Sequence, residues 1–185
     1  VRDRSDLPHA PRFENIWGVA DEDLFDMVLA HADERAASGQ PFFIHMMTTS
    51  NHKPFTFRAG LEEYGVRPVH GGRESGVRYA DYAQARLLSA AATHPWFRDT
   101  IFIIVADHGA RVYGRQEIPL RTYEIPLLFY SPAHIRPQRV DGLMTQIDVA
   151  PTLLGLLGLP YAAPWFGQDV LRTPEEGRLA FFAHN

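Results

Sequence analysis

The chain has 185 residues, 45% of them hydrophobic, and a formal charge of −4 at pH 7, which suits one domain or a large piece of one. The weak negative charge and the lack of any Lys/Arg run exclude the electrostatic footprint of a nucleic-acid binder. Because the sequence has no cysteine, disulfides, thiolate metal ligands and a cysteine nucleophile are excluded as well. No signal peptide is visible, and every apolar run is too short to span a bilayer.

The first part of the chain predicts an arm, a helix and a strand. Residues 1–14, with their prolines and charges, predict an irregular arm. Acidic residues beginning at Asp21 suit a helix N-terminus, and apolar residues at helical spacing continue that helix to the stop at Gly39. Large apolar residues at 41–49 predict a buried strand, and the polar residues 48–54 predict a loop at its carboxyl end.

A glycine- and proline-rich excursion over residues 55–73 leads to the second half of the chain. Ser75 is expected to cap a helix over residues 76–93, since apolar side chains recur on one face. Six apolar residues at 101–106, four of them Val, Ile or Phe, predict the clearest strand. The remaining predicted elements are a loop at 107–119, a strand at 125–130, a helix that is capped by Asp148 and runs to Leu157, and a last strand at 179–182.

The order of these elements predicts an α/β fold. The strands are apolar with little alternation, which indicates a sheet sandwiched between helices. Ligands of such sheets bind beyond the carboxyl ends of the strands. The polar loops after residues 41–49 and 101–106 are therefore the candidate site.

Asp107 and His108 directly follow the predicted strand 101–106. Gly109 permits a turn there, so the two side chains are able to converge on one point. A carboxylate with an imidazole suits zinc or manganese. The alternative is that Asp107 caps the next turn and His108 is a surface residue.

The second candidate is the polar loop that contains His52. This imidazole is suited to hold a phosphate oxygen or to act as a general acid. Thr48, Thr49 or Ser50 is in principle a nucleophile activated by it, and the alternative is a plain turn. Arg111 follows His108 closely and either binds an anionic substrate or is a solvated loop arginine.

Together these segments resemble the lipoteichoic acid synthase and phosphoglycerol transferase branch of the alkaline phosphatase/sulfatase superfamily. The matching segments recur in the expected order over roughly residues 15–171. They are Trp17-Gly18-Val19, Pro41-Phe42-Phe43 through Thr48-Thr49-Ser50-Asn51-His52-Lys53-Pro54-Phe55, Tyr79-Ala80-Asp81-Tyr82, Thr100-Ile101 through Asp107-His108-Gly109, Ile125-Pro126-Leu127, Asp148 through Thr152, and Gly167-Gln168-Asp169.

The resemblance implies a fold and a site. Residues 1–185 would form the C-terminal part of one sulfatase-type catalytic domain, and the nucleophilic threonine and an acidic metal ligand would lie upstream of it. Asp107 and His108 match two ligands of a divalent metal, expected to be manganese, with zinc, magnesium or calcium as alternatives. His52 matches the histidine that contacts the transferred phosphoglycerol group. The serine that lipoteichoic acid synthase uses after His108 is absent, and Arg111 lies nearby instead.

The resemblance also implies a function for the parent protein. It would be anchored at the periplasmic or extracellular face of a bacterial membrane. There it would move phosphoglycerol from an anionic phospholipid to a glycan or polymer through a covalent threonine intermediate. The fragment alone is expected to be inactive and to self-associate through an exposed sheet edge. The alternatives are a sulfatase or phosphodiesterase of the same superfamily, and a non-catalytic binding module that keeps the fold.

Overall fold

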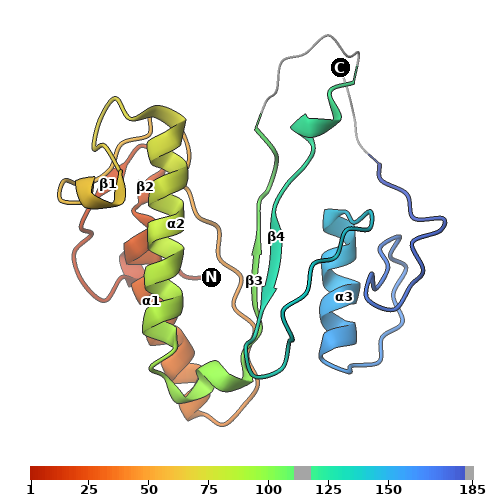
Figure 1. The fold of residues 1–185 in the computed structure, drawn as a ribbon. Helices are drawn as coiled ribbons and strands as arrows, with labels where there is room; N and C mark the ends of the chain where they lie inside the picture. The colour runs from red at the N-terminus through yellow and green to blue at the C-terminus, as the bar shows by residue number, and fades with distance from the viewer. Residues whose placement is uncertain (111–117, 182–185) are drawn as a thin grey trace. The chain divides into compact units, whose positions relative to one another are not determined.

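The computed structural model describes residues 1–110 and 118–181. The chain divides into two compact units, Val1–Thr100 and Ile101–Asn185. Each unit combines helical and extended segments, and each is drawn in Figure 1 with its elements labelled. Within the described residues, no helix combines the length and the apolar content needed to cross a bilayer.

Two long helices dominate the first unit. Its elements are η1 (Arg4–Asp6), β1 (Glu14–Asn15), β2 (Gly18–Val19), α1 (Asp21–Ala37), η2 (Glu62–Tyr64), α2 (Gly72–Ala91) and η3 (Pro95–Asp99), with β1 and β2 pairing antiparallel. The predicted helix from Asp21 is confirmed. The second helix begins earlier than predicted, so Ser75 lies inside its first turns, and the Ser75 hydroxyl accepts a hydrogen bond from the Arg67 backbone N–H.

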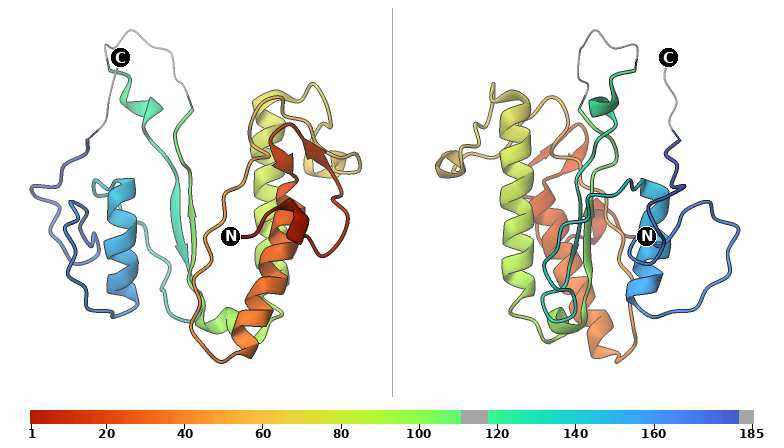
Figure 2. Two further views of the ribbon diagram at one scale, coloured as in Figure 1. Left: turned by 180° about the vertical axis from the view of Figure 1, so that it is seen from behind. Right: turned by 45° about the vertical axis from the view of Figure 1, so that its right-hand side comes forward.

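Helices α1 and α2 lie side by side and run in the same direction, as the views in Figures 1 and 2 show. Asp26 on α1 pairs with Arg86 on α2 at 2.8 Å, and further along Asp33 pairs with His94 at 2.7 Å. The apolar core fills the space beside these helices. Its buried members are Ala20, Phe25, Phe57, Leu61, Val66, Tyr79, Ala83 and Leu87.

The first turn of α1 places three consecutive acidic side chains in the interior. Asp21, Glu22 and Asp23 are each at most 2% exposed. Asp23 accepts hydrogen bonds from the backbone N–H and the guanidinium of Arg12. Glu22 receives two bonds of 2.9 Å from Arg58, and the hydroxyls of Tyr79 and Tyr82 donate to it as well. These carboxylates therefore join the N-terminal arm, a loop and α2 to one helix end.

Residues 41–49 do not form the predicted strand. Their exposure nevertheless alternates as in a strand: Phe42, Ile44 and Met46 are half-buried, whereas Phe43 and Met47 are more than 70% exposed. The run was predicted to be a buried strand with little alternation, whereas every second side chain is exposed. A strand also needs a backbone partner. Within the described part of the chain, no segment forms a ladder with these residues.

The second unit is built on a two-stranded sheet and one helix. Its elements are β3 (Phe102–Val105), η4 (Leu120–Thr122), β4 (Leu127–Tyr130), η5 (Gln146–Asp148) and α3 (Val149–Leu156). Strands β3 and β4 pair antiparallel, with Phe102 opposite Tyr130 and Val105 opposite Leu127. Both strands were predicted, within one or two residues at each end. They are half-buried rather than fully buried, because within the described residues they pair only with each other.

Asp148 holds the start of α3 in a different way from the one predicted. Its carboxylate gives α3 no side-chain cap and instead closes a capping box with Thr145 at the start of η5. Its other carboxylate oxygen accepts the Gln168 backbone N–H at 2.8 Å. The predicted last strand is absent at residues 179–181, and Phe182 lies outside the described residues.

Replacing Glu22 tests how much the buried acidic run stabilises the first unit. Glu22→Gln leaves the Arg58 guanidinium without its carboxylate, and we expect unfolding to become easier by roughly 3 kcal/mol in urea titrations. The matched control is Glu74→Gln, because Glu74 forms an exposed ion pair with Arg78. We expect the control to change stability by no more than about 0.5 kcal/mol. Equal losses in both variants would contradict this account.

The ion pair between Glu22 and Arg58 also predicts that the first unit becomes less stable at acid pH. Burial disfavours the Glu22 carboxylate, but Arg58 and the two tyrosines outweigh burial and hold the pKa of Glu22 below its usual value. A carboxylate with a lowered folded-state pKa stabilises the fold fully above its unfolded pKa, about 4.3 for Glu. That stabilisation is lost as the pH falls through the lower folded-state value. Acidification should therefore lower the free energy of unfolding less in Glu22→Gln than in the wild type, as urea titrations at several pH values would show.

Candidate functional site

Asp107 and His108 lie where the sequence predicted them, just beyond the end of β3. The Ala106 backbone N–H still bonds to the Pro126 carbonyl at 3.3 Å, so the ladder ends immediately before Asp107. Both side chains are largely exposed, at 84% for Asp107 and 78% for His108. The pair thus sits on a fixed strand end and faces solvent.

The two side chains converge. Asp107 Oδ1 accepts the backbone N–H of His108 at 2.9 Å, which leaves Oδ2 only 3.6 Å from His108 Nε2. His108 Nδ1 lies 2.9 Å from the Gly109 carbonyl, which accepts and never donates, so Nδ1 carries a hydrogen. In the neutral ring, Nε2 then carries a lone pair, and this atom is the one that lies 3.6 Å from Oδ2.

This arrangement suits a metal ion. A ligating histidine usually donates its second ring N–H to a carbonyl or carboxylate, as His108 does to Gly109. Zinc binds histidine nitrogen and carboxylate oxygen at about 2.0–2.2 Å, and two atoms 3.6 Å apart both reach one ion at such distances. Within the described residues, no group of three or more His, Asp or Glu side chains is gathered around a common point. Within the described residues, this pair would therefore supply two ligands to a metal ion.

Gly109 allows this loop to lie close to the segment before β4. A Cβ atom at position 109 would come within 2.1 Å of the Thr122 carbonyl oxygen. Real Cβ atoms essentially never approach a heavy atom so closely, so any side chain would push the loop away from η4. The glycine was expected to permit a turn, and the structure adds that it permits close packing.

The loop that carries His52 is held by α1 and by Trp17. Asp21 Oδ1 accepts the backbone N–H groups of Thr49 and Ser50 at 3.2 and 3.1 Å, and the Asp21 backbone N–H donates to Ser50 Oγ at 3.1 Å. The Trp17 ring lies 3.9 Å from the His52 ring, and its indole N–H donates to the Lys53 carbonyl. The exposed His52 ring is therefore fixed from two sides.

These contacts bear on the nucleophile alternatives. Ser50 is buried, and its hydroxyl is engaged with Asp21, so it is a poor candidate for activation by His52. Burial raises the pKa of Asp21, while the bonds from Ser50 and Thr49 act in the opposite direction. The Asp21 carboxylate thus serves as an acceptor for the loop backbone, and Thr48 remains exposed beside it.

Helix α2 supports the same loop through a glycine. A Cβ atom on Gly76 would meet Asn51 Oδ1 at 2.5 Å and the Phe55 ring at 2.9 Å. Phe55 has a positive φ of 55°, and its backbone N–H closes the turn by bonding to the His52 carbonyl at 2.9 Å. Residues 51–55 therefore fold tightly against α2 at Gly76, where the helix has no side chain in the way.

The predicted site residues fall in different parts of the chain. Asp107 and His108 belong together in the second unit, whereas His52 belongs to the first. Arg111 lies outside the described residues. The convergence of all four residues on one site stays a prediction.

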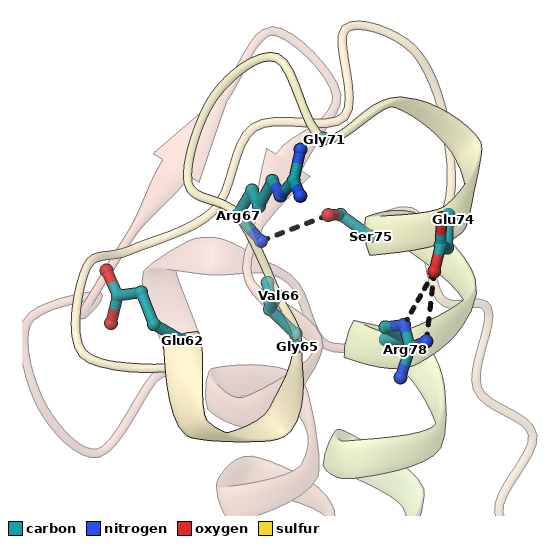
Figure 3. A pocket seen from close by; sticks show the side chains of 8 residues that line it. All are labelled: Glu62, Gly65, Val66, Arg67, Gly71, Glu74, Ser75 and Arg78. Atoms are coloured by element: carbon teal, nitrogen blue, oxygen red, sulfur yellow. Dashed lines mark hydrogen bonds and ion pairs between the residues drawn. The ribbon is translucent and has the colours of Figure 1, made fainter.

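A surface hollow in the first unit lies apart from these candidates in the sequence. It has a volume of about 490 Å³ and is lined by residues between Glu62 and Arg78, as Figure 3 shows. Its charged groups are partly satisfied, since Arg78 bonds to Glu74 at 2.9 and 3.1 Å. None of the predicted site residues lines this hollow.

Two solved structures share the fold of this chain. A crystal structure of a protein in the alkaline phosphatase superfamily from Vibrio parahaemolyticus is 36% identical and aligns with a TM-score of 0.78, covering 90% of this chain and 40% of that one. The lipoteichoic acid synthase LtaP from Listeria monocytogenes aligns with a TM-score of 0.65 at 18% identity, covering 92% of this chain and 45% of LtaP. The chain thus has part of an α/β fold of this superfamily, as the sequence predicted.

The family follows from the sequence match. Residues 2–159 match the sulfatase family model, so the chain belongs to the sulfatase family. Phosphoglycerol transferase I of Xanthomonas campestris is 25% identical over 166 residues, which are 88% of this chain and 24% of that protein. A lipoteichoic acid synthase-like protein of Bacillus subtilis is 24% identical over an alignment 196 positions long, which covers 93% of this chain and 31% of that protein. The predicted resemblance to this branch is confirmed, and the chain spans about a quarter to a third of these relatives.

The sequence reasoning missed the residues that hold the loops. Asp21 was read as an ordinary helix-start residue, and Trp17 was noted only as part of a segment that resembles the family. A run of three acidic residues in the first turn of a helix is a weak signal for burial, because charged residues are rarely buried unless paired. Arg12 and Arg58, the partners of Asp23 and Glu22, lie far away in the sequence.

Gly76→Ala tests the close approach between α2 and the His52 loop. Alanine favours the helix by up to about 1 kcal/mol, but the clash with Asn51 and Phe55 costs about 1–3 kcal/mol. We therefore expect a net destabilisation of roughly 1 kcal/mol in urea unfolding, together with shifts of the Asn51 and His52 amide resonances.

The matched control is Ser89→Ala, at an exposed position of the same helix. It should leave the loop resonances unchanged and stabilise the helix slightly. Unchanged His52 resonances in Gly76→Ala would show that the loop is free to move aside without effect on its histidine.

Proposed function

We propose that this chain is part of a metal-dependent transferase that moves phosphoglycerol from an anionic phospholipid to a glycan or polymer acceptor. Membership of the sulfatase family and the named relatives support an enzyme of this kind. The observation that carries the proposal is the convergence of Asp107 Oδ2 and His108 Nε2 at the end of β3. Enzymes of this superfamily generally depend on a divalent metal.

Asp107 and His108 are the proposed metal ligands in this chain. The donor set of one carboxylate and one imidazole fits manganese or zinc, and magnesium and calcium are alternatives with a stronger preference for oxygen. When bound, such an ion offsets negative charge on phosphoryl oxygens and lowers the pKa of a coordinated hydroxyl. The Gly109 carbonyl keeps the His108 ring in the tautomer that leaves Nε2 available.

His52 is proposed to hold the transferred phosphoglycerol group. Its Nδ1 lies 3.1 Å from the Lys53 carbonyl and therefore donates a hydrogen there, so Nε2 is the atom left to face a ligand. Contact with a phosphoryl oxygen through Nε2 requires a hydrogen on that atom, which makes the imidazolium the binding form. Trp17 and the Asp21-bound backbone keep the ring in place for this contact.

The remaining parts of the proposal come from the family resemblance. The nucleophile is a threonine that becomes covalently attached to the transferred group, and no residue of this chain is assigned to that role. Arg111 is proposed as a further contact to the anionic substrate. The protein acts at the periplasmic or extracellular face of a bacterial membrane, with a membrane anchor in the parent.

Metal binding by the chain is tested by calorimetric titration with manganese and zinc. We expect weak binding, because two protein ligands leave most of the coordination shell to water. Asp107→Asn and His108→Ala should each weaken it further. The matched control is Asp141→Asn, an exposed aspartate of the same unit that pairs with Arg139 and should leave binding unchanged. Submicromolar affinity lost in His108→Ala would show that this chain supplies further ligands and would contradict the two-ligand site.

Turnover separates the proposed transferase from the other reactions of the family. Without an acceptor, the parent protein should release only a stoichiometric amount of diacylglycerol from phosphatidylglycerol, as the threonine becomes loaded. Repeated turnover should need an acceptor, and His52→Ala should lower that rate by about tenfold or more. The chain alone should give no product. Hydrolysis of a sulfate ester by the parent instead would favour a sulfatase, to which the family description points. Turnover by the chain itself, abolished in Thr48→Ala, would place the nucleophile here and contradict the proposal.

A further inference from the structure

Gln146 is tied to the loop that carries Asp107 and His108. It is the first residue of η5, and its side-chain Nε2 lies 2.8 Å from the Ala106 carbonyl oxygen and 2.9 Å from the Asp107 carbonyl oxygen. A primary amide nitrogen carries two hydrogens. Both are therefore committed to two successive carbonyls of one loop.

These two carbonyls belong to the peptide groups on either side of the Asp107 Cα. Because each peptide group is planar, holding its oxygen fixes the orientation of the whole plane. The two planes together set the backbone angles of Asp107 and hence the direction of its Cβ. The second plane also contains the His108 N–H, which bonds to Asp107 Oδ1 at 2.9 Å. Gln146 thus orients the carboxylate and the start of His108 at once.

Gln146 is itself firmly placed. It follows Thr145, whose backbone N–H and hydroxyl both bond to Asp148 Oδ2 at 2.8 Å. The other oxygen of this buried carboxylate accepts the Gln168 backbone N–H. Gly167 makes the contact possible, because a Cβ atom there would lie 1.9 Å from the Ile147 carbonyl oxygen. The position of the amide therefore depends on residues 145–148 and 167–168.

The contact differs from ordinary stabilisation of the fold. Gln146 and the loop are exposed, so water replaces the lost hydrogen bonds when the amide is removed. Little stability then depends on this residue. The direction of the Asp107 side chain does depend on it, because a solvated loop samples many orientations that do not bring Oδ2 toward His108 Nε2.

We infer that Gln146 is a positioning residue that orients Asp107 and His108 for metal binding. The inference rests on the proposed role of those two residues as metal ligands. Residues that orient metal ligands typically change metal affinity by about 10–100-fold when they are replaced. Gln146 acts through the backbone, so we expect the lower end of that range.

The test is paramagnetic broadening of amide resonances by manganese ions, which reports weak binding at a known residue. The variant is Gln146→Met, which keeps the length of the side chain but removes both donors. We expect about tenfold more manganese to be needed for half-maximal broadening at His108 and Gly109. Gln146→Asn, too short to span the same carbonyls, should behave in the same way. The matched control is Gln138→Met, at an exposed position of the same unit.

The outcomes separate this inference from the proposed function. Thermal unfolding midpoints of Gln146→Met and Gln138→Met should agree, so that weaker manganese binding in the first variant alone supports positioning. Equal manganese dependence in both, with broadening abolished in Asp107→Asn, would overturn the role of Gln146 and leave the metal ligands intact. Broadening that persists unchanged in Asp107→Asn would overturn both the metal site and the inference built on it.

Discussion

The first unit depends on the burial of three consecutive carboxylates at the start of α1. Removing a charged group from water costs several kcal/mol unless hydrogen bonds or an opposite charge compensate. Each carboxylate finds its partner in a different segment: Asp23 in Arg12 of the arm, Glu22 in Arg58, and Asp21 in the backbone of residues 49–50. The arm, the loop and α2 must therefore assemble around the helix end together. The helix N-terminus adds a favourable field for all three charges.

A buried carboxylate at a helix start also holds a distant segment in the second unit. Asp148 is buried and, like Asp21, accepts backbone N–H groups from a distant segment. In both units the carboxylate stands at the start of a helix and the candidate functional loop lies one contact away. His52 follows the loop bound by Asp21, and Asp107 is reached from the Asp148 turn through Gln146. The candidate functional loops thus have an irregular backbone, but hydrogen bonds from defined residues hold each of them in place.

Sequence reasoning succeeded where the signal is local. Apolar residues at helical spacing predicted α1 and α2, and the run before Asp107 predicted β3 and hence where the loop with Asp107 and His108 begins. It failed where the outcome depends on a distant partner. Residues 41–49 alternate as a strand does, yet no described segment pairs with them. Ser75 and Asp148 were taken as helix caps because of their residue type, although their oxygens bond to other groups. The burial of Asp21 to Asp23 could be predicted only by knowing which arginines of other segments pair with these carboxylates.

The contact between Trp17 and His52 gives this chain an optical probe of its own. An imidazolium close to an indole quenches its fluorescence more strongly than a neutral imidazole does. Protonation of His52, or displacement of its loop, should therefore change the emission of Trp17, whose ring lies 3.9 Å away. Trp96, which lies near His94 at 5.2 Å, and Trp165 would both be replaced by phenylalanine to isolate the signal. The fluorescence of Trp17 then reports the state of the His52 loop in the absence of substrate.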